Sequence, residues 1–308
     1  MRKLISLLLL LTLLIPGAVF AEEAADTTAV RTLPVDLNPG PVPDEANYIT
    51  DESGARVAYE DETVTVTMER VKVGDSTFNV ARIKIAHASQ LRTGLANEKA
   101  TRTNKISTMA KNQNAIVAIG GDYFSDAKNG YVVRQYNVYR KSPKSVYDML
   151  LIDDQGNFHI ILQSDPDELQ ALLATEGLTF PNAFHFGPAM IKDGVLLEMP
   201  QYYIDNGNKY NIRSTSEPRC AIGQLGELEY MFVVVDGRRD DSDGCSVAEL
   251  AQWMYEQGCV QAYNLDGGNS ALMWFGGENY SDKTVKGERS VSDIIYIATA
   301  IDPNAEEE

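Results

Sequence analysis

The part of the sequence that decides the fold begins with Tyr-Met-Phe-Val-Val-Val-Asp-Gly-Arg at residues 230–238. Its first six residues, Tyr230–Val235, are all apolar and rich in valine, which is typical of a strand buried on both faces. A second short apolar segment, Cys259–Leu265, is followed by Asp-Gly-Gly-Asn-Ser at residues 266–270. Each segment predicts a buried strand with an aspartate, Asp236 or Asp266, directly after it.

The residues between these two strands have the pattern of a helix. Ser246 and Glu249 have the spacing of a capping box, and Gly258 stands where a left-handed residue ends a helix. The order strand, helix, strand over Tyr230–Leu265 predicts a βαβ unit, whose strands run parallel. Because parallel strands have their carboxyl ends at one edge of the sheet, where α/β sheets bind ligands, we expect Asp236 and Asp266 to emerge there together.

The rest of the chain has mostly strand patterns. Thr63–Met68 and Phe78–Ile85 alternate between apolar and polar residues, which predicts an antiparallel pair with one wet face. Antiparallel strands beside a parallel unit, with few helices, predict an α+β fold of mixed parallel and antiparallel sheets. The sequence also predicts a short helix at Ser107–Lys111 and a helix from Asp165 to Gly177. Further strands are expected at Ala115–Ile119, Met149–Ile152, Phe158–Leu162, Arg219–Gly223, which pairs with Tyr230–Val235, and Ser290–Ile301.

The first residues have the composition of a secretory signal peptide. A basic start, an apolar segment from Leu4 to Leu14 and small residues before Glu22 predict a signal peptide at residues 1–21. Residues 22–47 are acidic and rich in proline, which predicts a flexible or extended leader. We expect one domain at residues 48–302 and an acidic tail at 303–308. The mature protein is thus predicted to be secreted or surface-associated, without membrane insertion.

The charge of the chain excludes some partners. Without Arg2 and Lys3, 25 basic residues stand against 44 acidic ones, a net charge of −19. Nucleic acid binding needs a basic face, so this composition argues against it. A basic pocket inside an acidic protein stays physically allowed, because salt limits charge repulsion to about 8 Å.

Cysteines and known cofactor motifs point to neither a disulfide nor an organic cofactor. Cys245 and Cys259 flank the predicted helix at about 21 Å, too far for a disulfide, so we expect Cys220, Cys245 and Cys259 to be small core residues. No P-loop or Rossmann glycine motif is present. The acidic loop at residues 240–244 lacks the EF-hand pattern, which favours a solvated loop. No metal ligands are assigned, although an accessory divalent cation stays open.

The candidate site is built from acidic and glycine-rich strand ends. Gly120-Gly121-Asp122 ends the strand Ala115–Ile119 as Asp266-Gly267-Gly268 ends Cys259–Leu265. An Asp-Gly pair is more often an ordinary turn, but paired glycines after a buried strand also let a ligand approach the backbone. The arginines are equally suited to a phosphate or to a salt bridge with a neighbouring aspartate. Ser270 has no histidine nearby in sequence, which argues against a serine triad, and His185 is a candidate pocket residue.

These motifs together resemble those of the phosphodiester glycosidase family. The resemblance rests on Ala-Ile-Gly-Gly-Asp-Tyr-Phe (118–124), Val-Asp-Gly-Arg (235–238) and Asn-Leu-Asp-Gly-Gly-Asn-Ser (264–270), and extends weakly over residues 59–301. Two residues depart from the family pattern: Gly120 replaces an asparagine, and Asn269 stands where a glycine is usual. Both departures fall in the presumed site and concern the choice of substrate.

The resemblance implies hydrolysis of a sugar-1-phosphodiester at the anomeric carbon, in an exported glycan or cell-wall polymer. It implies Asp266 as base or nucleophile, with Asp122 and Asp236 orienting sugar hydroxyls or an ion. The residues implied in substrate binding are Arg238, Arg289, Arg219, Asn264, Gly267, Gly268, Ser270, Gly121, Tyr123 and His185. Two alternatives stay open: a metal-assisted phosphodiesterase that cleaves the P–O bond, and a secreted glycan-binding or cell-envelope protein without activity.

Overall fold

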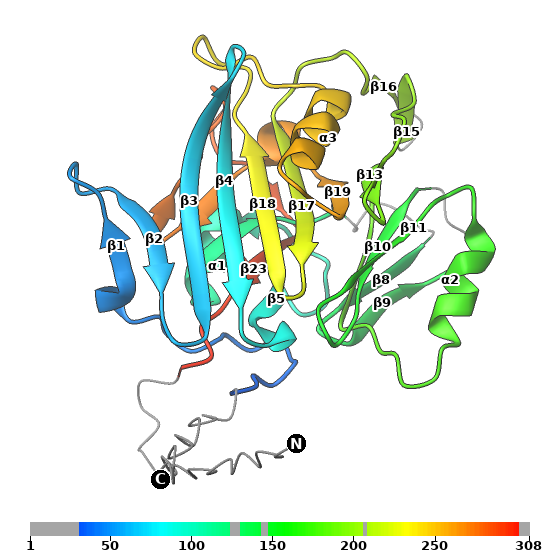
Figure 1. Cartoon of the computed structure of the whole chain (residues 1–308), viewed down its shortest axis with the longest axis horizontal. Coiled ribbons are helices and arrows are strands. Elements are labelled where there is room, and N and C mark those ends of the chain that lie inside the picture. The colour runs from blue at the N-terminus through cyan, green and yellow to red at the C-terminus, as the bar shows by residue number, and fades with distance from the viewer. Residues whose placement is uncertain (1–30, 124–129, 143–146, 206–207, 302–308) are drawn as a thin grey trace, which may run out of the picture.

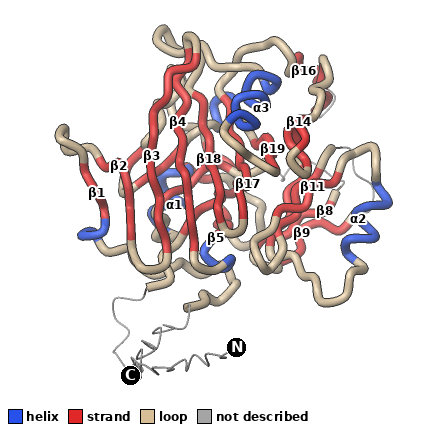
Figure 2. Tube along the Cα trace, in the orientation of Figure 1, coloured by secondary structure: helices blue, strands red, loops and turns tan. Residues whose placement is uncertain are grey.

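The computed structural model describes residues 31–123, 130–142, 147–205 and 208–301. The predicted signal peptide, the first part of the leader and the acidic tail lie outside the described residues. Strands make up most of the regular secondary structure, with three α-helices in the described part (Figures 1 and 2). These helices are α1 (Ile106–Asn112), α2 (Pro166–Leu173) and α3 (Val247–Glu256), and short 3-10 turns are η1 (Glu45–Asn47), η2 (Ala88–Gln90) and η3 (Gly268–Ser270).

The largest sheet has nine strands. In spatial order they are β1 (Tyr48–Thr50), β2 (Arg56–Glu60), β3 (Val64–Val73), β4 (Ser76–Ile85), β18 (Glu229–Val235), β17 (Arg219–Gly226), β19 (Gln261–Leu265), β13 (Ala189–Lys192) and β14 (Val195–Leu196). It is the broad sheet that faces the viewer in Figure 1, with β3 and β4 near its middle. The site described below lies at the end of β19.

Two five-stranded sheets and two short pairs complete the architecture. The second sheet contains β21 (Glu278–Asn279), β20 (Met273–Phe275), β7 (Val117–Gly120), β23 (Asp293–Ile297) and β5 (Leu91–Leu95). The third contains β11 (Phe158–Ile161), β10 (Met149–Ile152), β12 (Asn182–His185), β8 (Tyr131–Arg134) and β9 (Asn137–Lys141). The short pairs are β15 (Tyr202–Asp205) with β16 (Asn208–Asn211), and β22 (Ser290–Val291) with β6 (Asn104–Lys105).

The main core lies between the nine-stranded sheet and the second sheet. Val66 and Phe232 of the first sheet pack in one cluster with Ile119 and Ile295 of the second. Helix α3 covers the opposite face of the nine-stranded sheet, and α1 covers the outer face of the second sheet. Helix α2 packs on the third sheet, as Figure 1 shows. Each amphipathic element thus buries its apolar side against a sheet.

The local predictions are confirmed for most elements. The alternating segments form the antiparallel pair β3–β4, with Val64 opposite Ile85. Helix α3 begins after Ser246, whose hydroxyl oxygen accepts from Glu249 N, and Gly258 follows it at φ +90°. The hairpins β10–β11 and β17–β18 also form as predicted. Cys220, Cys245 and Cys259 are unpaired and buried, which confirms their prediction as core residues.

The prediction of parallel pairing within a βαβ unit is wrong. Every described strand pair is antiparallel, and β17 lies between β18 and β19. β18 and β19 do run in the same direction, because both are antiparallel to β17. The tight turn before Glu229 places β17 beside β18, so the strand that follows α3 reaches only the free edge of β17. The fold is α+β with antiparallel sheets and few helices.

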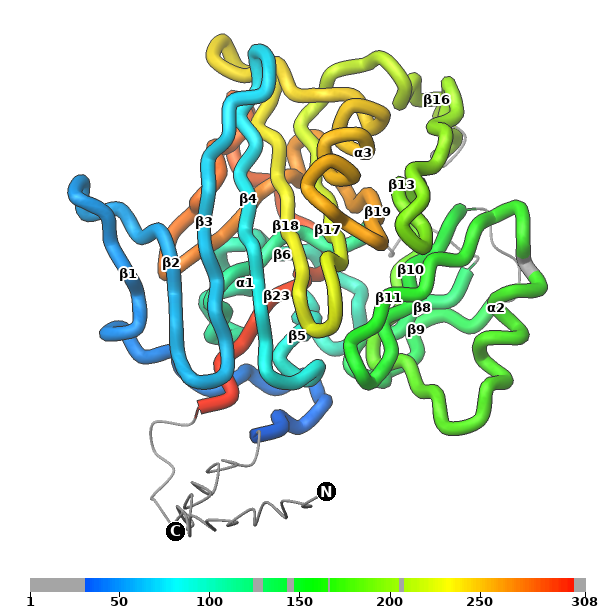
Figure 3. The backbone as a smooth tube through the Cα atoms, in the orientation of Figure 1, coloured from blue at the N-terminus to red at the C-terminus, as the bar shows by residue number. Residues whose placement is uncertain are grey.

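The described part of the leader lies against the domain. The Arg92 side chain is buried, and its guanidinium donates to the carbonyl oxygens of Pro34, Asp36 and Asn38. The amide of Asn114 donates to Gly40 O at 2.8 Å. In Figure 3 this blue segment runs along the same edge of the molecule as the red end of the chain. In the described part of the chain, no helix is long and apolar enough to cross a membrane.

Candidate active site

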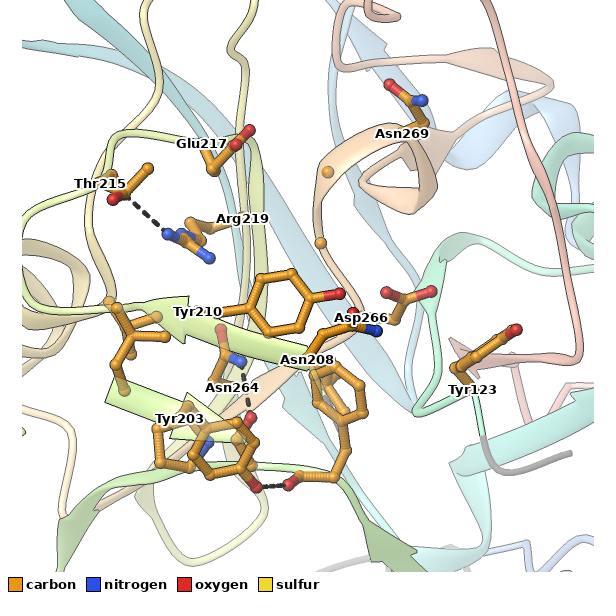
Figure 4. Close-up of a pocket in the computed structure, with 18 of the residues that line it drawn as sticks. Tyr123, Tyr203, Asn208, Tyr210, Thr215, Glu217, Arg219, Asn264, Asp266 and Asn269 are labelled. Atoms are coloured by element: carbon orange, nitrogen blue, oxygen red, sulfur yellow. Dashed lines mark hydrogen bonds between the residues drawn. The ribbon is translucent and has the colours of Figure 1, made fainter. Parts of the chain in front are cut away.

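A pocket of about 530 Å³ opens at the carboxyl end of β19 (Figure 4). Four segments far apart in sequence form its walls: residues 186–188 before β13, the β15–β16 hairpin, residues 215–219 leading into β17, and residues 264–269 after β19. The remaining lining residues are Tyr123, Ile212, Arg238, Val247 and Arg289. The pocket therefore joins the nine-stranded sheet to loops from all parts of the domain.

Asp266 lines this pocket as predicted, directly after the last residue of β19. Its backbone N–H donates to Gly121 O at 3.1 Å, which ties the loop to the end of β7. Gly267 approaches residue 218 so closely that an added Cβ would lie 2.7 Å from Pro218 O. The glycine after the aspartate therefore serves the close packing of two backbone segments. Gly268 also lines the pocket, at φ +61°.

Asp236 ends at the same edge of the sheet but on its opposite face. Val235 packs in the cluster beneath α3, so the next side chain points to the other side of the sheet. Leu265 packs between the sheets, so Asp266 points to the α3 side. Among the described residues, Asp236 is not part of the pocket lining. Asp236 and Asp266 each follow the last residue of a strand. The side chains before them, Val235 and Leu265, point to opposite faces of the sheet, so the two carboxylates do so as well.

Asp236 has a buried polar environment of its own. Its Oδ1 accepts from Asn79 Nδ2 at 2.8 Å and from Asp282 N at 3.1 Å. Burial raises the pKa of Asp236 to about 6; the hydrogen bond from Asn79 opposes this shift and the charge of Asp282 adds to it. This carboxyl therefore joins β4, β18 and the loop at Asp282.

The raised pKa of Asp236 predicts a pH-dependent stability. The folded protein keeps the proton of Asp236 up to about pH 6, whereas the unfolded chain releases it near pH 4. The contribution of this carboxyl to the free energy of unfolding is therefore fully present below pH 4 and is lost as the pH rises through 6. Asp236→Asn should remove up to roughly 3 kcal/mol of that loss. Chemical unfolding between pH 4 and 8 measures it. Asp240→Asn, exposed in the next loop, should behave as wild type, and an unchanged pH profile in Asp236→Asn would refute the assignment.

Asp122 lies in a buried ion cluster. Its Oδ1 accepts from Arg134 Nη2 at 2.6 Å, and Arg134 Nε donates to Asp293 Oδ2 at 2.7 Å. All three side chains are fully buried. Asp122 Oδ2 also accepts from His185 N at 2.8 Å, so the cluster holds the strand end that leads into the pocket wall at residue 186. Among the described residues, Asp122 is absent from the pocket lining, and this position indicates support of the site.

Three further predicted site residues, Gly121, His185 and Ser270, lie near the buried ion cluster or in the loop after β19. Gly121 has no room for a side chain, because an added Cβ would lie 2.3 Å from Asp293 Oδ2. His185 is buried beside the Tyr147 ring, and burial lowers the pKa of His185 to about 4. Ser270 is buried within η3. Among the described pocket residues, none of these three contributes to the lining.

The three predicted arginines all line the pocket, but their partners differ. Arg238 Nε donates to Glu217 Oε2 at 2.5 Å, and Arg238 Nη1 donates to Asn269 Oδ1 at 3.0 Å. Arg219 donates to the backbone oxygens of Cys245 and Thr215, both at 2.9 Å. Among the described residues, neither Arg219 nor Arg289 forms an ion pair with a carboxylate, so both can receive an anion.

Arg219 is a half-buried cation whose orientation is fixed by hydrogen bonds. Loss of solvent lowers the pKa of Arg219, yet a guanidinium stays charged. Its two backbone hydrogen bonds fix the plane of the group at the wall of the pocket. The guanidinium carbon of Arg289 lies 5.4 Å from the centre of the Tyr123 ring. The pocket thus carries three arginines against two acidic residues in a strongly acidic protein.

Several pocket residues were not predicted from the sequence. Tyr203 and Tyr210 come from a hairpin whose short polar strands resemble a loop in sequence. Glu217 precedes β17 without a recognisable motif. Phe186 is half-buried and belongs to a short aromatic segment that does not stand out in the sequence. Arg134, which binds Asp122, has no signal beyond its position in an apolar strand. Asn264, which was predicted, lines the pocket two residues before Asp266.

A metal site is not prearranged in the part of the chain that the structure describes. No group of three or more histidine, cysteine, aspartate or glutamate side chains there could hold an ion. In the acidic loop, Asp241 accepts from Arg239 Nε at 2.8 Å. The accessory cation stays a prediction without a defined set of ligands.

The match to a family model decides which family this chain comes from. The model described as phosphodiester glycosidase matches residues 113–298. The chain belongs to the phosphodiester glycosidase family. The matched range includes every pocket residue named above, from Tyr123 to Arg289. The family match therefore covers the pocket walls as well as Asp122 and Asp236.

One curated relative and two solved structures are also similar to this chain. The chain is 24% identical over 205 residues to the SPbeta prophage-derived uncharacterized protein YomE of Bacillus subtilis, which covers 64% of this chain and 30% of that protein. The chain thus spans about a third of the length of this curated relative. The catalytic domain of zebrafish N-acetylglucosamine-1-phosphodiester alpha-N-acetylglucosaminidase superposes with a TM-score of 0.57 at 15% identity, over 82% of this chain and 87% of that one. A hypothetical protein from Synechocystis also superposes with a TM-score of 0.57, at 18% identity, over 79% of this chain and 64% of that one. At 15% and 18% identity, these two structures show that they share the fold of this phosphodiester glycosidase domain, and nothing more.

Proposed function

We propose that this pocket hydrolyses the bond between the anomeric carbon of a sugar and the bridging oxygen of a phosphodiester, in exported or cell-envelope glycans. The family match and the fold shared with the zebrafish enzyme support a phosphodiester glycosidase. The observation that carries the proposal is that Asp266 lines the pocket together with two arginines, Arg219 and Arg289, that form no ion pair with a described carboxylate. A site for a neutral glycoside has no need of such cations.

The chemistry requires few protein groups. The carboxylate of Asp266 activates water, or attacks the anomeric carbon itself, as the C1–O bond breaks. The electron pair of that bond leaves with the phosphate oxygen, and the products are the free sugar and a phosphomonoester. Because a phosphomonoester anion is already a good leaving group, strong protonation by a second carboxyl is less necessary than for an ordinary glycoside. The second acidic residue of the lining, Glu217, is bound to Arg238.

The leaving phosphate is stabilised by the arginines. Arg219 and Arg289 present guanidinium groups to the pocket, and a guanidinium binds phosphate oxygens in a planar fork. Arg238, which the family resemblance implied in substrate binding with Arg289, is held by Glu217 and Asn269. We therefore assign the phosphate clamp to Arg219 and Arg289 and give Arg238 the role of holding the loop at Asn269. Gly268 lies against the Arg238 guanidinium and completes this side of the pocket.

Isotope labelling tests the reaction itself. The chain from residue 22 is incubated with N-acetyl-α-D-glucosamine 1-(methyl phosphate) and α-D-glucose 1-(methyl phosphate) in ¹⁸O-labelled water, with and without chelator. Cleavage at the anomeric carbon releases methyl phosphate and places the label in the sugar. Label in the phosphate would instead establish P–O cleavage, the metal-assisted alternative. Saturable binding to surface polymer without any product would support the glycan-binding alternative.

Replacement of Arg219 is expected to lower activity toward these phosphodiesters selectively. Arg219→Met should lower kcat/KM for these phosphodiesters by about 10- to 150-fold, because it removes one or two charge-assisted hydrogen bonds to the phosphate. Steady-state kinetics at low and high salt measure the loss, which should shrink as salt rises. Arg239→Met is the matched control, since Arg239 lies outside the described lining and pairs with Asp241. Equal losses in both variants would remove Arg219 from the clamp.

A further inference from the structure

The β15–β16 hairpin has two chemically different faces. Tyr203 is directly opposite Tyr210 in the antiparallel register, so both rings lie on the same face of the hairpin. Both rings line the pocket. Tyr202 and Ile204 alternate with them and belong to the other face, where Tyr202 is 42% exposed and its ring lies 3.8 Å from Lys209 Nζ. The hairpin therefore turns a pair of aromatic rings toward the pocket.

The two pocket-facing tyrosines differ in how they are held. The Tyr203 hydroxyl donates to Phe186 O, and the Tyr203 ring packs 5.4 Å from the ring of Tyr147. Tyr203 thus fastens the hairpin to the wall of the pocket. Tyr210 is 50% exposed, and within the described residues its side chain makes no hydrogen bond or ring contact. An uncovered aromatic ring at a pocket has its face available to a ligand.

A buried acceptor without a partner lies in the same pocket. Asn264 is buried, and its Nδ2 donates to Gly187 O at 2.8 Å, which fixes the orientation of the amide. Its Oδ1 is buried and has no hydrogen-bond partner among the described residues. A buried acceptor of this kind is costly unless a donor reaches it. Because no described residue donates to Asn264 Oδ1, its donor is left to water or a ligand.

Asn264 and Asp266 lie on the same face of the chain at the end of β19. They stand two residues apart at the end of β19, about 7 Å along the strand, and both line the pocket. In Figure 4, Thr215, Glu217 and Arg219 lie on one side of Tyr210, whereas Asn264 and Tyr203 lie on the other. Arg219 and Tyr203 therefore lie on opposite sides of the Tyr210 ring, and all three line the pocket with Asp266.

We propose that Tyr210, Tyr203 and Asn264 form the subsite for the sugar ring that is released, and that they select a neutral pyranose. This inference rests on the proposed function and adds the substrate class. The C–H groups on one face of a pyranose are weakly positive and suit the negative face of the Tyr210 ring. A hydroxyl or N–H of the sugar donates to Asn264 Oδ1. A carboxylate at this position of the sugar is disfavoured, because it would face a buried acceptor instead of donating to it.

Binding measured without turnover tests the subsite directly. Asp266→Asn protein is titrated with N-acetyl-α-D-glucosamine 1-(methyl phosphate), with α-D-glucose 1-(methyl phosphate) and with inorganic phosphate. Tyr210→Ala in this background should weaken binding of at least one of the two sugar phosphodiesters roughly tenfold and leave phosphate binding unchanged. Tyr210→Phe, which keeps the ring, should bind within about twofold of the parent, by the same reasoning.

Tyr202→Ala is the matched control, because it removes a similar ring from the outer face of the same hairpin. It should bind every probe as the parent does. Equal weakening by Tyr202→Ala and Tyr210→Ala would mean that the hairpin acts only through its folding, and unchanged binding in Tyr210→Ala would also overturn the proposal.

Deoxy analogues test the acceptor. A panel of monodeoxy α-D-glucose 1-(methyl phosphates) should contain one member that binds much more weakly than the parent sugar, by about 10- to 100-fold. In Asn264→Ala this difference between deoxy and parent sugar should disappear, while phosphate binding persists. A discrimination that survives in Asn264→Ala would contradict the role of its Oδ1.

These outcomes are separable from those that test the reaction. Wild-type protein that hydrolyses neither phosphodiester but still shows the Tyr210 and Asn264 binding effects would refute the proposed function and keep the sugar subsite. If the wild-type protein hydrolyses a phosphodiester and Tyr210→Ala leaves the KM unchanged, the subsite is refuted and the reaction is kept.

Discussion

Asp266→Asn is expected to lower kcat for a sugar-1-phosphodiester by about a thousandfold or more, with little change in KM. The amide has nearly the same shape as the carboxylate, so the loop after β19 keeps its position, including the hydrogen bond from residue 266 N to Gly121 O. An amide can neither take a proton from water at neutral pH nor form a covalent bond with the anomeric carbon. The transition state therefore loses its anionic partner, whereas ground-state binding by Arg219 and Arg289 persists.

The measurement is single-turnover and steady-state kinetics on the active phosphodiester, with thermal unfolding to establish that the variant folds. Asp236→Asn is the informative control, because Asp236 follows an equivalent strand end but points to the opposite face of the sheet. It should keep activity within a few-fold of wild type, as expected for a residue outside the site. Retained activity in Asp266→Asn, or an equal loss in both variants, would reassign the catalytic carboxylate.

Arg134→Met is expected to destabilise the fold more than any of the other replacements. Arg134 donates to Asp122 and Asp293 and also to the carbonyl oxygens of Val133 and Ala183. Its guanidinium carbon lies 4.0 Å from the centre of the Phe184 ring. Without this cation two buried carboxyls face each other uncompensated, and loss of a buried ion-pair partner typically costs about 3–5 kcal/mol. Urea unfolding at pH 7.5 measures this cost.

The loss should also depend on pH. Burial already raises the pKa of Asp293 in the wild-type protein, with Arg134 opposing the shift. In Arg134→Met the folded state keeps protons that the unfolded chain releases, so the variant loses stability as pH rises and approaches wild type toward pH 4. Arg213→Met removes an exposed pair with Glu198 and should cost less than about 1 kcal/mol. A deficit in Arg134→Met that is constant with pH, or no larger than that of Arg213→Met, would refute the role of the cluster.

Much of the local structure could be predicted from the sequence because it depends on near neighbours. The capping box of Ser246 and Glu249, the turn glycine after α3 and the alternation of β3 and β4 are all set by residues within one turn or one strand. The pairing of the strands could not be predicted, because it depends on which edge of β17 is free after its hairpin with β18 has formed. The same direction of β18 and β19 was predicted correctly, but not the strand between them.

The site shows the same division. Asp122, Asp236 and Asp266 all follow apolar strands, and sequence alone does not distinguish their roles. Register separates Asp236 from Asp266, since one residue of difference in the alternation sends the side chains to opposite faces. Arg134 separates Asp122 from the pocket by binding it in the interior. The tyrosines of the β15–β16 hairpin were missed because short polar strands have no periodicity strong enough to distinguish them from a loop.

The sequence by itself determined the family, the antiparallel pair β3–β4, the capped helix α3 and the placement of Asp266 at a strand end, because each depends on residue types at short, fixed spacings. Only the tertiary structure decided that a single one of the three aspartates lines the pocket, that Arg219 and Arg289 form no ion pair with a described carboxylate, and that two tyrosines of one hairpin line the same pocket as Asn264. These properties depend on contacts between residues tens to hundreds of positions apart. Such contacts are set by how sheets and loops pack together, and no local pattern in the chain encodes them.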